Sequence, residues 1–365
     1  MVEVDKPLFT PGPLTTSHAV KEAMLRDFGS RDTEFIDIVA GIRRDLLELA
    51  GLSQELGWEA ILMQGSGTFA IESVISSITP PDGKWLVVVN GAYGDRIMKI
   101  LQRYGIDADE IRSDENELPD LDAISNALSG GSFSHLAAVH CETTSGIINP
   151  VNEIGSLAKE HGCIYFLDSM SAFGGIEFNV EKSEIDFLVS SANKCIEGVP
   201  GFGFVICCRD ALEDTRGYAR TISLDILSQW EGLEKSGQFR FTPPTHVLIA
   251  FAKALDELRE EGGIVARSKR YKVNHTACLK GMRALGFEEY VPESLQGHII
   301  TSFLYPKDSF DFEKFYDLLN DKGFVIYPGK ITKEDCFRIG HIGHIFEKDT
   351  KSLVNAISEV MEELN

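Results

Sequence analysis

The middle of the chain alternates short apolar runs with amphipathic stretches, and this alternation constrains the fold more than any other feature. The apolar runs are six or seven residues long and cover residues 84–90, 135–140, 163–168, 185–190 and 203–208. Runs of this length suit strands that are buried on both faces. Between several of them the apolar residues recur at helical spacing, as at 92–104 and 152–161. Strands that alternate with helices predict an α/β fold with a mostly parallel sheet.

The pattern changes after Gly262 and Gly263, where a hinge between two domains is predicted. Beyond them the sequence favours a helix at 266–285, a strand at 298–305, a helix at 311–323, a strand pair around VIYPGK and CFRIGHIG, and a closing helix near 350–364. This order is typical of a small α+β domain. We therefore expect an N-terminal segment at 1–15, a large domain at 16–262 and a small C-terminal domain at 263–365.

The charge of the chain excludes several kinds of partner. The 365 residues include 35 Lys or Arg and 56 Asp or Glu, so the formal net charge is −21. Nucleic acid is excluded because a polyanion needs a basic stripe, and an anionic membrane surface is disfavoured for the same reason. Anionic small molecules stay open if a small positive pocket holds them. We therefore expect acidic residues to be sparse around such a pocket.

Three features indicate a cytoplasmic protein. The N-terminal residues MVEVDKPLFTPGP lack the basic and apolar regions of a secretory signal. The apolar runs are far shorter than the ~20 residues that span a bilayer. The seven cysteines form no C-x-x-C pair, which favours reduced, buried thiols over disulfides or a zinc site.

The first candidate site is the segment QGSGTFA at residues 64–70. Gly67 lets the backbone approach a ligand closely, and Ser66 and Thr68 add hydroxyl groups at a helix start, where free N–H groups favour a phosphate. An ordinary helix cap with a glycine turn is the alternative. The segment is neither a P-loop nor a G-x-G-x-x-G motif, which disfavours nucleoside triphosphates and dinucleotides.

Asp168 and Lys194 each follow a strand-like run. Asp168 ends the run at 163–168, at the edge where α/β proteins place ligands, although it could also be a capping or loop aspartate. Lys194 comes soon after another apolar run. A desolvated lysine there becomes a nucleophile that can form a Schiff base, and a surface loop lysine is the alternative.

Together these three features are the parts needed to hold pyridoxal phosphate. A lysine forms an imine with the cofactor, an aspartate pairs with the protonated pyridine nitrogen, and a helix N-terminus holds the phosphate. The separation of 26 residues between Asp168 and Lys194 leaves room for one strand, a turn and a second strand.

The whole chain resembles the alanine–glyoxylate and serine–pyruvate branch of the class V aminotransferase family, which are fold-type I pyridoxal-phosphate enzymes. The resemblance is carried by FTPGPLTTSHAVKEAML, QGSGTFAIE, NGAYGDR, HCETTSGIINP, DSMSAFGGI, SSANKCIEGVPGFGFVI, FRFTPPTH, VIYPGK and CFRIGHIG. It implies a large domain with a mixed, mostly parallel seven-stranded sheet between helices, and a smaller C-terminal α+β domain.

The implied activity is pyridoxal-phosphate-dependent transfer of an amino group from 2-aminoethylphosphonate to pyruvate, which gives phosphonoacetaldehyde and alanine. Alanine or serine with glyoxylate or pyruvate is the alternative substrate pair. A catalytically silent dimer that only binds a ligand is a third hypothesis, and the presence of Lys194, Asp168 and Arg338 argues against it.

The resemblance also implies a role for each site residue. Lys194 would be the Schiff-base lysine and the base for proton transfer, and Asp168 would contact the pyridinium nitrogen. The cofactor phosphate would be bound by Ser66, Gly67 and Thr68.

Four further residues gain implied roles, each with a simpler alternative. Tyr93 would stack on the cofactor ring, or be a core or interface tyrosine. Thr143 would hydrogen-bond the 3-oxygen of the ring, or bond locally at a strand end. Thr242 would reach the phosphate of the neighbouring subunit in a homodimer with interfacial sites, or simply precede a proline turn. Arg338 would clamp the anionic substrate group, or pair with an acidic neighbour in its strand.

Three other features invite weaker hypotheses. Arg31 is a weaker candidate for an anion site, and a surface salt bridge is favoured there. His341 and His344 are three residues apart, but the sequence offers no further ligand at motif spacing, so no metal is expected. Cys195 is interpreted as a small buried apolar side chain rather than a nucleophile.

Overall fold

The structure, a computed structural model, describes residues 5–306, 310–330 and 334–364, and its larger sheet has seven strands in the order β2-β10-β9-β8-β5-β3-β4. Strand β10 is antiparallel to both of its neighbours, and the other adjacent pairs are parallel. The bounds are β2 Trp58–Gln64, β3 Lys84–Val89, β4 Asp107–Arg112, β5 His135–Val139, β8 Ile164–Asp168, β9 Phe187–Ser191 and β10 Phe202–Cys208. The predicted mixed, mostly parallel seven-stranded sheet is confirmed.

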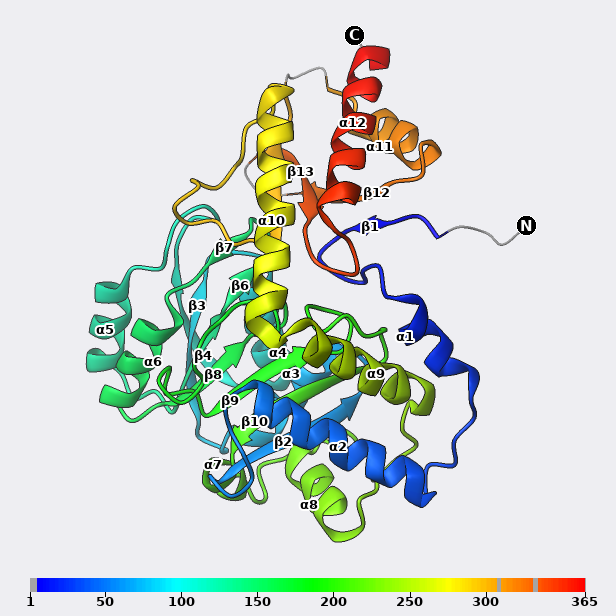
Figure 1. Ribbon diagram of the computed structural model, residues 1–365. Helices are drawn as coiled ribbons and strands as arrows, with labels where there is room; N and C mark the ends of the chain where they lie inside the picture. Colours follow the sequence, from blue (N-terminus) through cyan, green and yellow to red (C-terminus); the bar gives the residue numbers. More distant parts are fainter. Residues whose placement is uncertain (1–4, 307–309, 331–333, 365) are drawn as a thin grey trace.

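Eight helices of the large domain pack around this sheet (Figure 1). They are α2 Thr33–Leu49, α3 Gly67–Ile78, α4 Ala92–Tyr104, α5 Leu121–Gly130, α6 Val151–Glu160, α7 Arg209–Glu213, α8 Ile226–Ser236 and α9 Thr245–Glu261. In α4, apolar residues at helical spacing, Ile97, Ile100 and Leu101, are buried against the sheet, as their spacing predicts. Over the described residues, none of the helices is long and apolar enough to cross a membrane.

A second sheet of four strands, in the order β1-β12-β13-β11, forms the small α+β part of the molecule. Its elements are β1 Leu8–Phe9, α10 Gly263–Ala284, β11 Ile300–Leu304, α11 Phe312–Asp321, β12 Val325–Lys330, β13 Asp335–Gly340 and α12 Glu347–Leu364. A separate apolar core fills it, with Phe303, Phe315 and Phe337 fully buried. Figure 1 shows α10 extending from the large sheet to this second sheet.

The N-terminal segment contributes to both parts of the molecule. Its strand β1 pairs in parallel with β12, with Leu8 opposite Val325, and Phe9 joins the core of the small domain. The chain then returns toward the large domain, through α1 His18–Glu22 and the short 3₁₀ helix η1 Ala23–Leu25. Two short strands, β6 Cys141–Glu142 and β7 Ile147–Ile148, complete the described elements.

The two glycines of the predicted hinge lie where α9 ends and α10 begins. Gly262 has a φ of 111° and Gly263 a φ of 76°, in the left-handed region that favours glycine. The predicted domain bounds of 1–15, 16–262 and 263–365 stay a prediction, which the separate apolar cores support.

Candidate active site

A cavity of about 160 Å³ lies beside the carboxyl ends of β8 and β9. Its lining residues are Ser66, Gly67, Thr68, Ile71, Tyr93, Arg96, Asp168, Met170, Ser191, Asn193 and Lys194. Six of the predicted site residues thus line one cavity. They meet there because helix starts and the carboxyl ends of strands lie at one edge of an α/β sheet. Asp168 is the only acidic residue in this lining, as the charge argument predicts. A larger groove of about 620 Å³ between α10 and α12 contains none of the predicted residues.

The start of α3 forms one wall of the cavity. Ser66 is its N-cap but makes no side-chain capping hydrogen bond, so the first N–H groups of the helix are left for another acceptor. A Cβ atom on Gly67 would lie 2.2 Å from the sulfur atom of Met170, so a larger residue would have to displace the Met170 side chain. Arg96 donates a hydrogen bond of 3.2 Å to Oγ1 of Thr68. A helix N-terminus together with a guanidinium group is suited to a phosphate.

Asp168 presents an incompletely bonded carboxylate to the cavity. It is 1% exposed, and its Oδ1 accepts a hydrogen bond of 2.9 Å from the N–H of Met170. Its Oδ2 is buried and has no hydrogen-bond partner among the described residues. Burial raises the pKa of Asp168 to about 6, against the opposing effects of the Met170 N–H and the charges of Arg96 and Lys194. A buried acceptor of this kind calls for a donor from a ligand, and a protonated pyridine nitrogen fits.

Lys194 supplies a buried amine to the same cavity. Its side chain is 9% exposed, and Nζ donates a hydrogen bond of 2.9 Å to the carbonyl oxygen of Pro11. Burial lowers the pKa of Lys194 to about 8, although the neighbouring Cys195 and Asp168 act in the opposite direction. A larger fraction of the amine is therefore neutral near pH 7 than for an ordinary lysine, which suits a nucleophile.

Tyr93 lies in the first turn of α4, with the Arg96 guanidinium 4.7 Å from its ring centroid. The main-chain N–H of Tyr93 and that of Gly94 donate to Oε2 of Glu142, at 3.1 and 3.4 Å. Glu142 therefore acts as the cap of α4. Burial raises the pKa of Glu142 to about 7, against the effect of these hydrogen bonds. The position of Tyr93 in the lining allows its ring to face a planar ligand.

Thr143 and Arg338 lie together just outside this lining. Thr143 is buried, and its carbonyl oxygen accepts a hydrogen bond of 2.7 Å from Nη1 of Arg338. Nη2 of Arg338 donates to the carbonyl oxygen of Pro328 at 2.9 Å, and the guanidinium lies 4.6 Å from the ring centroid of Tyr327. The Nε atom of Arg338 is buried without a partner among the described residues. These contacts of Arg338 are to two backbone carbonyl oxygens and an aromatic ring, and its role stays a prediction.

Thr242 and Arg31 also lie outside the cavity lining. Thr242 is exposed in the loop before α9, and its carbonyl oxygen accepts a hydrogen bond of 3.4 Å from Nε2 of Gln64. Since Gln64 is the last residue of β2, Thr242 lies near the start of α3. Arg31 is exposed ahead of α2. The role of Thr242 across a subunit boundary stays a prediction.

The histidine and cysteine side chains near the site have ordinary structural partners. His341 is buried, with Nε2 2.9 Å from Oγ1 of Thr301, whereas His344 is exposed. Within the described ranges, groups of three or more His, Cys, Asp or Glu that could hold a metal ion are absent. Cys195 is buried and donates to the carbonyl oxygen of Ser171, and burial raises the pKa of its thiol to about 12.

Several residues of this site are not among those predicted from the sequence. Arg96 is the most important, because it contacts both the phosphate-suited helix start and the Tyr93 ring. Its spacing of three residues from Tyr93 on a predicted helix could have indicated it. Asn193 directly precedes Lys194 and also lines the cavity. Glu142 carries no local signal, because its role depends on contacts with a helix about 50 residues earlier in the chain.

Comparisons with known proteins give consistent findings. The profile of the family described as aminotransferase class-V matches residues 16–341. A 2-aminoethylphosphonate–pyruvate transaminase from Bacillus cytotoxicus is 50% identical over 354 residues, which cover 96% of this chain and 97% of that protein. A protein of the same name from Bacteroides fragilis is 49% identical over 355 residues, or 96% of this chain and 98% of that protein.

Solved structures with a similar fold have much lower identity. The ureidoglycine–glyoxylate aminotransferase from Bacillus subtilis has a TM-score of 0.90 at 22% identity, covering 100% of this chain and 94% of its own. An alanine–glyoxylate aminotransferase from Nostoc sp. also has a TM-score of 0.90, at 23% identity, covering 99% and 96%. At these identities the similarity concerns the fold alone.

Proposed function

This chain belongs to the class V aminotransferase family, and we propose that it transfers an amino group from 2-aminoethylphosphonate to pyruvate, giving phosphonoacetaldehyde and alanine. The observation that carries the chemistry is the buried carboxylate oxygen of Asp168, which has no donor among the described residues and lies in a cavity that also contains the amine of Lys194. The substrate assignment is supported by relatives that are about half identical over nearly their whole length.

The cofactor in this proposal is pyridoxal phosphate. When bound, it supplies an electron sink that stabilises negative charge on the substrate carbon next to the nitrogen. Asp168 would keep a proton on the ring nitrogen, and Tyr93 would pack against the ring. The N–H groups at Gly67 and Thr68, with Arg96, bind the phosphate.

Lys194 has two tasks in this proposal. Its neutral amine, favoured by the lowered pKa, would hold the cofactor covalently. With a substrate amine in its place, Nζ of Lys194 would be free to act as the base that accepts a proton from the substrate carbon. Burial of Nζ keeps water away from this transfer.

Arg338 is proposed to bind the anionic end of each substrate in turn. Its planar fork of N–H donors can hold a phosphonate or a carboxylate with two hydrogen bonds. In the structure Nη1 and Nη2 contact backbone carbonyl oxygens, while the buried Nε is left for another acceptor. Use of one arginine for two anions suits a reaction in which the substrates bind one after the other.

The proposal includes a homodimer in the cytoplasm with active sites at its interface. Three large apolar side chains lie exposed: Phe69 in the first turn of α3 at 53%, Ile222 in the loop before α8 at 75%, and Phe241 in the loop before α9 at 45%. Arg240 joins the last two, with its guanidinium 5.2 Å from the Phe241 ring centroid and a hydrogen bond to the carbonyl oxygen of Ile222. This patch lies next to Thr242, the residue assigned to the neighbouring site. The seven cysteines are free thiols, which suits a reducing compartment.

The test is an assay of purified protein with pyridoxal phosphate and a panel of amino donors and acceptors. Alanine formation from pyruvate should be fastest with 2-aminoethylphosphonate. Rapid turnover of alanine or serine with glyoxylate, and none of 2-aminoethylphosphonate, would assign the alternative substrates instead. An Arg338→Met variant should lose at least tenfold in kcat/KM with 2-aminoethylphosphonate. A matched Arg259→Met variant, which removes an exposed arginine outside the cavity lining, should not.

A further inference from the structure

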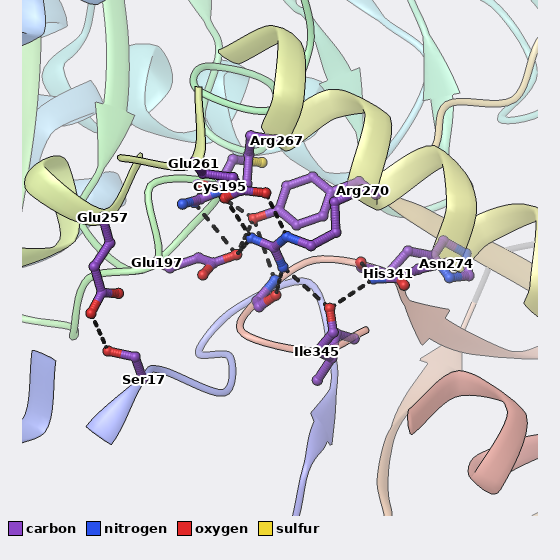
Figure 2. A network of polar contacts seen from close by, with 12 residues as sticks. Ser17, Cys195, Glu197, Glu257, Glu261, Arg267, Arg270, Asn274, His341 and Ile345 are labelled. Atoms are coloured by element: carbon purple, nitrogen blue, oxygen red, sulfur yellow. Dashed lines mark hydrogen bonds and ion pairs between the residues drawn. The ribbon is translucent and has the colours of Figure 1, made fainter. Parts of the chain in front are cut away.

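A buried group of charged and aromatic side chains lies next to Lys194 but outside the cavity lining (Figure 2). We call it the Arg270 cluster; it consists of Glu197, Glu261, Arg267, Arg270 and Tyr271. Glu197 is in the turn after Lys194, Glu261 is the last residue of α9, and the other three lie in the first half of α10. The cluster therefore occupies the junction at which the hinge glycines lie.

Glu197 connects the cluster to the Lys194 turn. Its Oε1 accepts hydrogen bonds of 2.7 Å from Nη2 of Arg270 and 2.6 Å from the hydroxyl of Tyr271, and its own N–H donates to the carbonyl oxygen of Lys194 at 2.8 Å. Glu197 has a φ of 66°, in the left-handed region that residues other than glycine rarely adopt. Such a conformation persists where the surroundings over-determine it.

Cys195, the residue directly after Lys194, is held by the same helix. Its carbonyl oxygen accepts a hydrogen bond of 2.7 Å from Nη1 of Arg267 and lies 3.1 Å from the Tyr271 hydroxyl. The turn that presents Lys194 to the cavity is thus attached to α10 at two successive points.

Arg270 also contacts the segment that follows the Arg338 strand. Its Nη1 donates to the carbonyl oxygens of Gly343 at 2.6 Å and Ile345 at 3.2 Å, just beyond β13. Asn274, one turn further along α10, donates to the carbonyl oxygen of the same Ile345 at 3.0 Å. Figure 2 shows Arg270 between Glu197 and Ile345. One side chain therefore joins the segment that bears Lys194 to the segment that bears Arg338.

The chemistry of the cluster favours a positioning role over a purely stabilising one. Two arginines balance two glutamates, and Arg267, Glu197 and Tyr271 are almost fully buried. Apolar side chains of similar volume would stabilise such a junction at least as well, because buried ions lose their hydration. Hydrogen-bonded charges, unlike apolar contacts, define the direction and distance of each partner.

We propose that Arg270 is a positioning residue that sets the separation of Lys194 and Arg338, so that a substrate anion on Arg338 has its reacting nitrogen within reach of Lys194. This inference rests on the proposed function only for the identity of that anion. Arg270 touches neither substrate nor cofactor in this scheme; it acts through Glu197 and through the backbone at Gly343 and Ile345.

The first test uses the chain without cofactor and the variants Arg270→Met, Arg270→Lys and Tyr271→Phe. The rate of acetylation of the Lys194 amine by acetic anhydride is followed against pH by peptide mass spectrometry. The wild-type midpoint is expected near the lowered pKa of about 8. Arg270→Met and Tyr271→Phe should raise this midpoint by at least half a pH unit, because a less firmly held turn admits water to Nζ of Lys194. Arg270→Lys should restore part of the shift, and the exposed control Arg259→Met should leave the midpoint unchanged.

The second test compares two amino donors in the complete enzyme. With 2-aminoethylphosphonate, kcat/KM of Arg270→Met should fall at least tenfold. With n-propylamine, which has no anionic group for Arg338 to hold, the loss should be less than threefold. The ratio of the two losses in kcat/KM measures how well the substrate anion is positioned, because a general loss of active enzyme would lower both values equally.

The outcomes separate the hypotheses. Unchanged acetylation midpoints in folded Arg270→Met and Tyr271→Phe would overturn the inference. A lowered melting temperature together with an unchanged midpoint and an equal loss of kcat/KM for both amino donors would also overturn it. If Arg270→Met does not fold, Tyr271→Phe, which removes one hydroxyl group, decides. If the wild type does not use 2-aminoethylphosphonate while the midpoints still shift, the proposed function fails and the positioning role of Arg270 stands.

Discussion

Asp168 and Lys194 illustrate how one environment prepares two groups of opposite charge. Burial disfavours the charged form of each, so it raises the pKa of Asp168 to about 6 and lowers the pKa of Lys194 to about 8. Their mutual attraction opposes both shifts but does not cancel them. The two groups that a transaminase needs most are therefore held in a less charged state until a ligand arrives, which is typical of functional sites.

The substitution Lys194→Ala tests the nucleophile. Turnover should fall by at least about 10⁴-fold, because no other side chain in the lining supplies an amine at this position. Cofactor should still bind through the α3 start and Asp168, but borohydride should no longer fix it to the protein. Loss of turnover measured by alanine formation, with an unchanged circular dichroism spectrum, is the expected result. Residual turnover within tenfold of the wild type would contradict the assignment.

The substitution Asp168→Asn should stabilise the chain without cofactor while weakening cofactor binding. Because the pKa of Asp168 in the folded state lies above its ordinary value of 3.8, its ionisation destabilises the folded state fully above about pH 6 and not at all below about pH 3.8. The shift corresponds to about 3 kcal/mol at most. The melting temperature at pH 7.5 should therefore rise by a few degrees.

The pH dependence of this rise in melting temperature tests the explanation. The difference in melting temperature between Asp168→Asn and the wild type should shrink as the pH falls from 6 toward 4, since the wild-type carboxyl group becomes protonated in that window. A gain that does not change with pH would mean that the amide is stabilising for another reason. Equilibrium dialysis with the cofactor should show weaker binding to the variant at pH 7.5.

At the scale of elements, the site is made by helix ends, and α4 depends on a residue from outside its own sequence. The first turn of α4 presents Tyr93 and Arg96, yet its N-cap is Gly91, which has no side chain to bond the free N–H groups. A Cβ atom on Gly91 would lie 2.3 Å from Cδ of Glu142, so the glycine makes room for the glutamate that caps the helix. The helix follows β3, whereas the glutamate that caps it lies in β6, after β5.

The substitution Glu142→Ala should therefore damage the site through α4. Loss of the cap leaves buried N–H groups unpaired and should lower the free energy of unfolding by about 1–3 kcal/mol. Cofactor affinity should also fall, because Tyr93 and Arg96 lose their fixed position. The matched control is Asp120→Ala, which removes an exposed cap of α5. It should lower the stability by about 1 kcal/mol and leave cofactor binding unchanged. Equal loss of cofactor affinity in both variants would contradict this account.

At the scale of the whole molecule, the exposed patch of Phe69, Ile222 and Phe241 bears on the assembly. We expect a native mass of about 81 kDa, twice the 40.4 kDa of one chain. The double substitution Ile222→Glu and Phe241→Glu should reduce this mass to that of one chain, because like charges and lost apolar contact oppose association. Light scattering after size exclusion measures the mass. A control with Leu56→Glu, an exposed leucine outside the patch, should stay dimeric, and a dimeric double variant would contradict the placement.

Much of the fold and part of the site could be predicted from local patterns. The residues 92–104 form α4 as their spacing indicates, and the apolar run at 84–90 contains β3. The strand β4 Asp107–Arg112 gave no such signal, because an exposed edge strand rich in acidic residues has no apolar alternation. Strand β1 was also missed, because two residues are too few to carry a pattern and they pair with a strand more than 300 residues away.

The sequence by itself determined many of the helices and strands, and it indicated a phosphate-suited helix start, a strand-end Asp168 and a lysine at 194 soon after a strand, because each of these signals lies within a few neighbouring residues. Only the tertiary structure decided which groups meet. It brought Arg96 to Thr68, left one oxygen of Asp168 unpartnered, and joined Glu197 to Arg270 across 73 residues of chain. Contacts of this kind depend on how all the elements pack together, and no local spacing of residues encodes that packing.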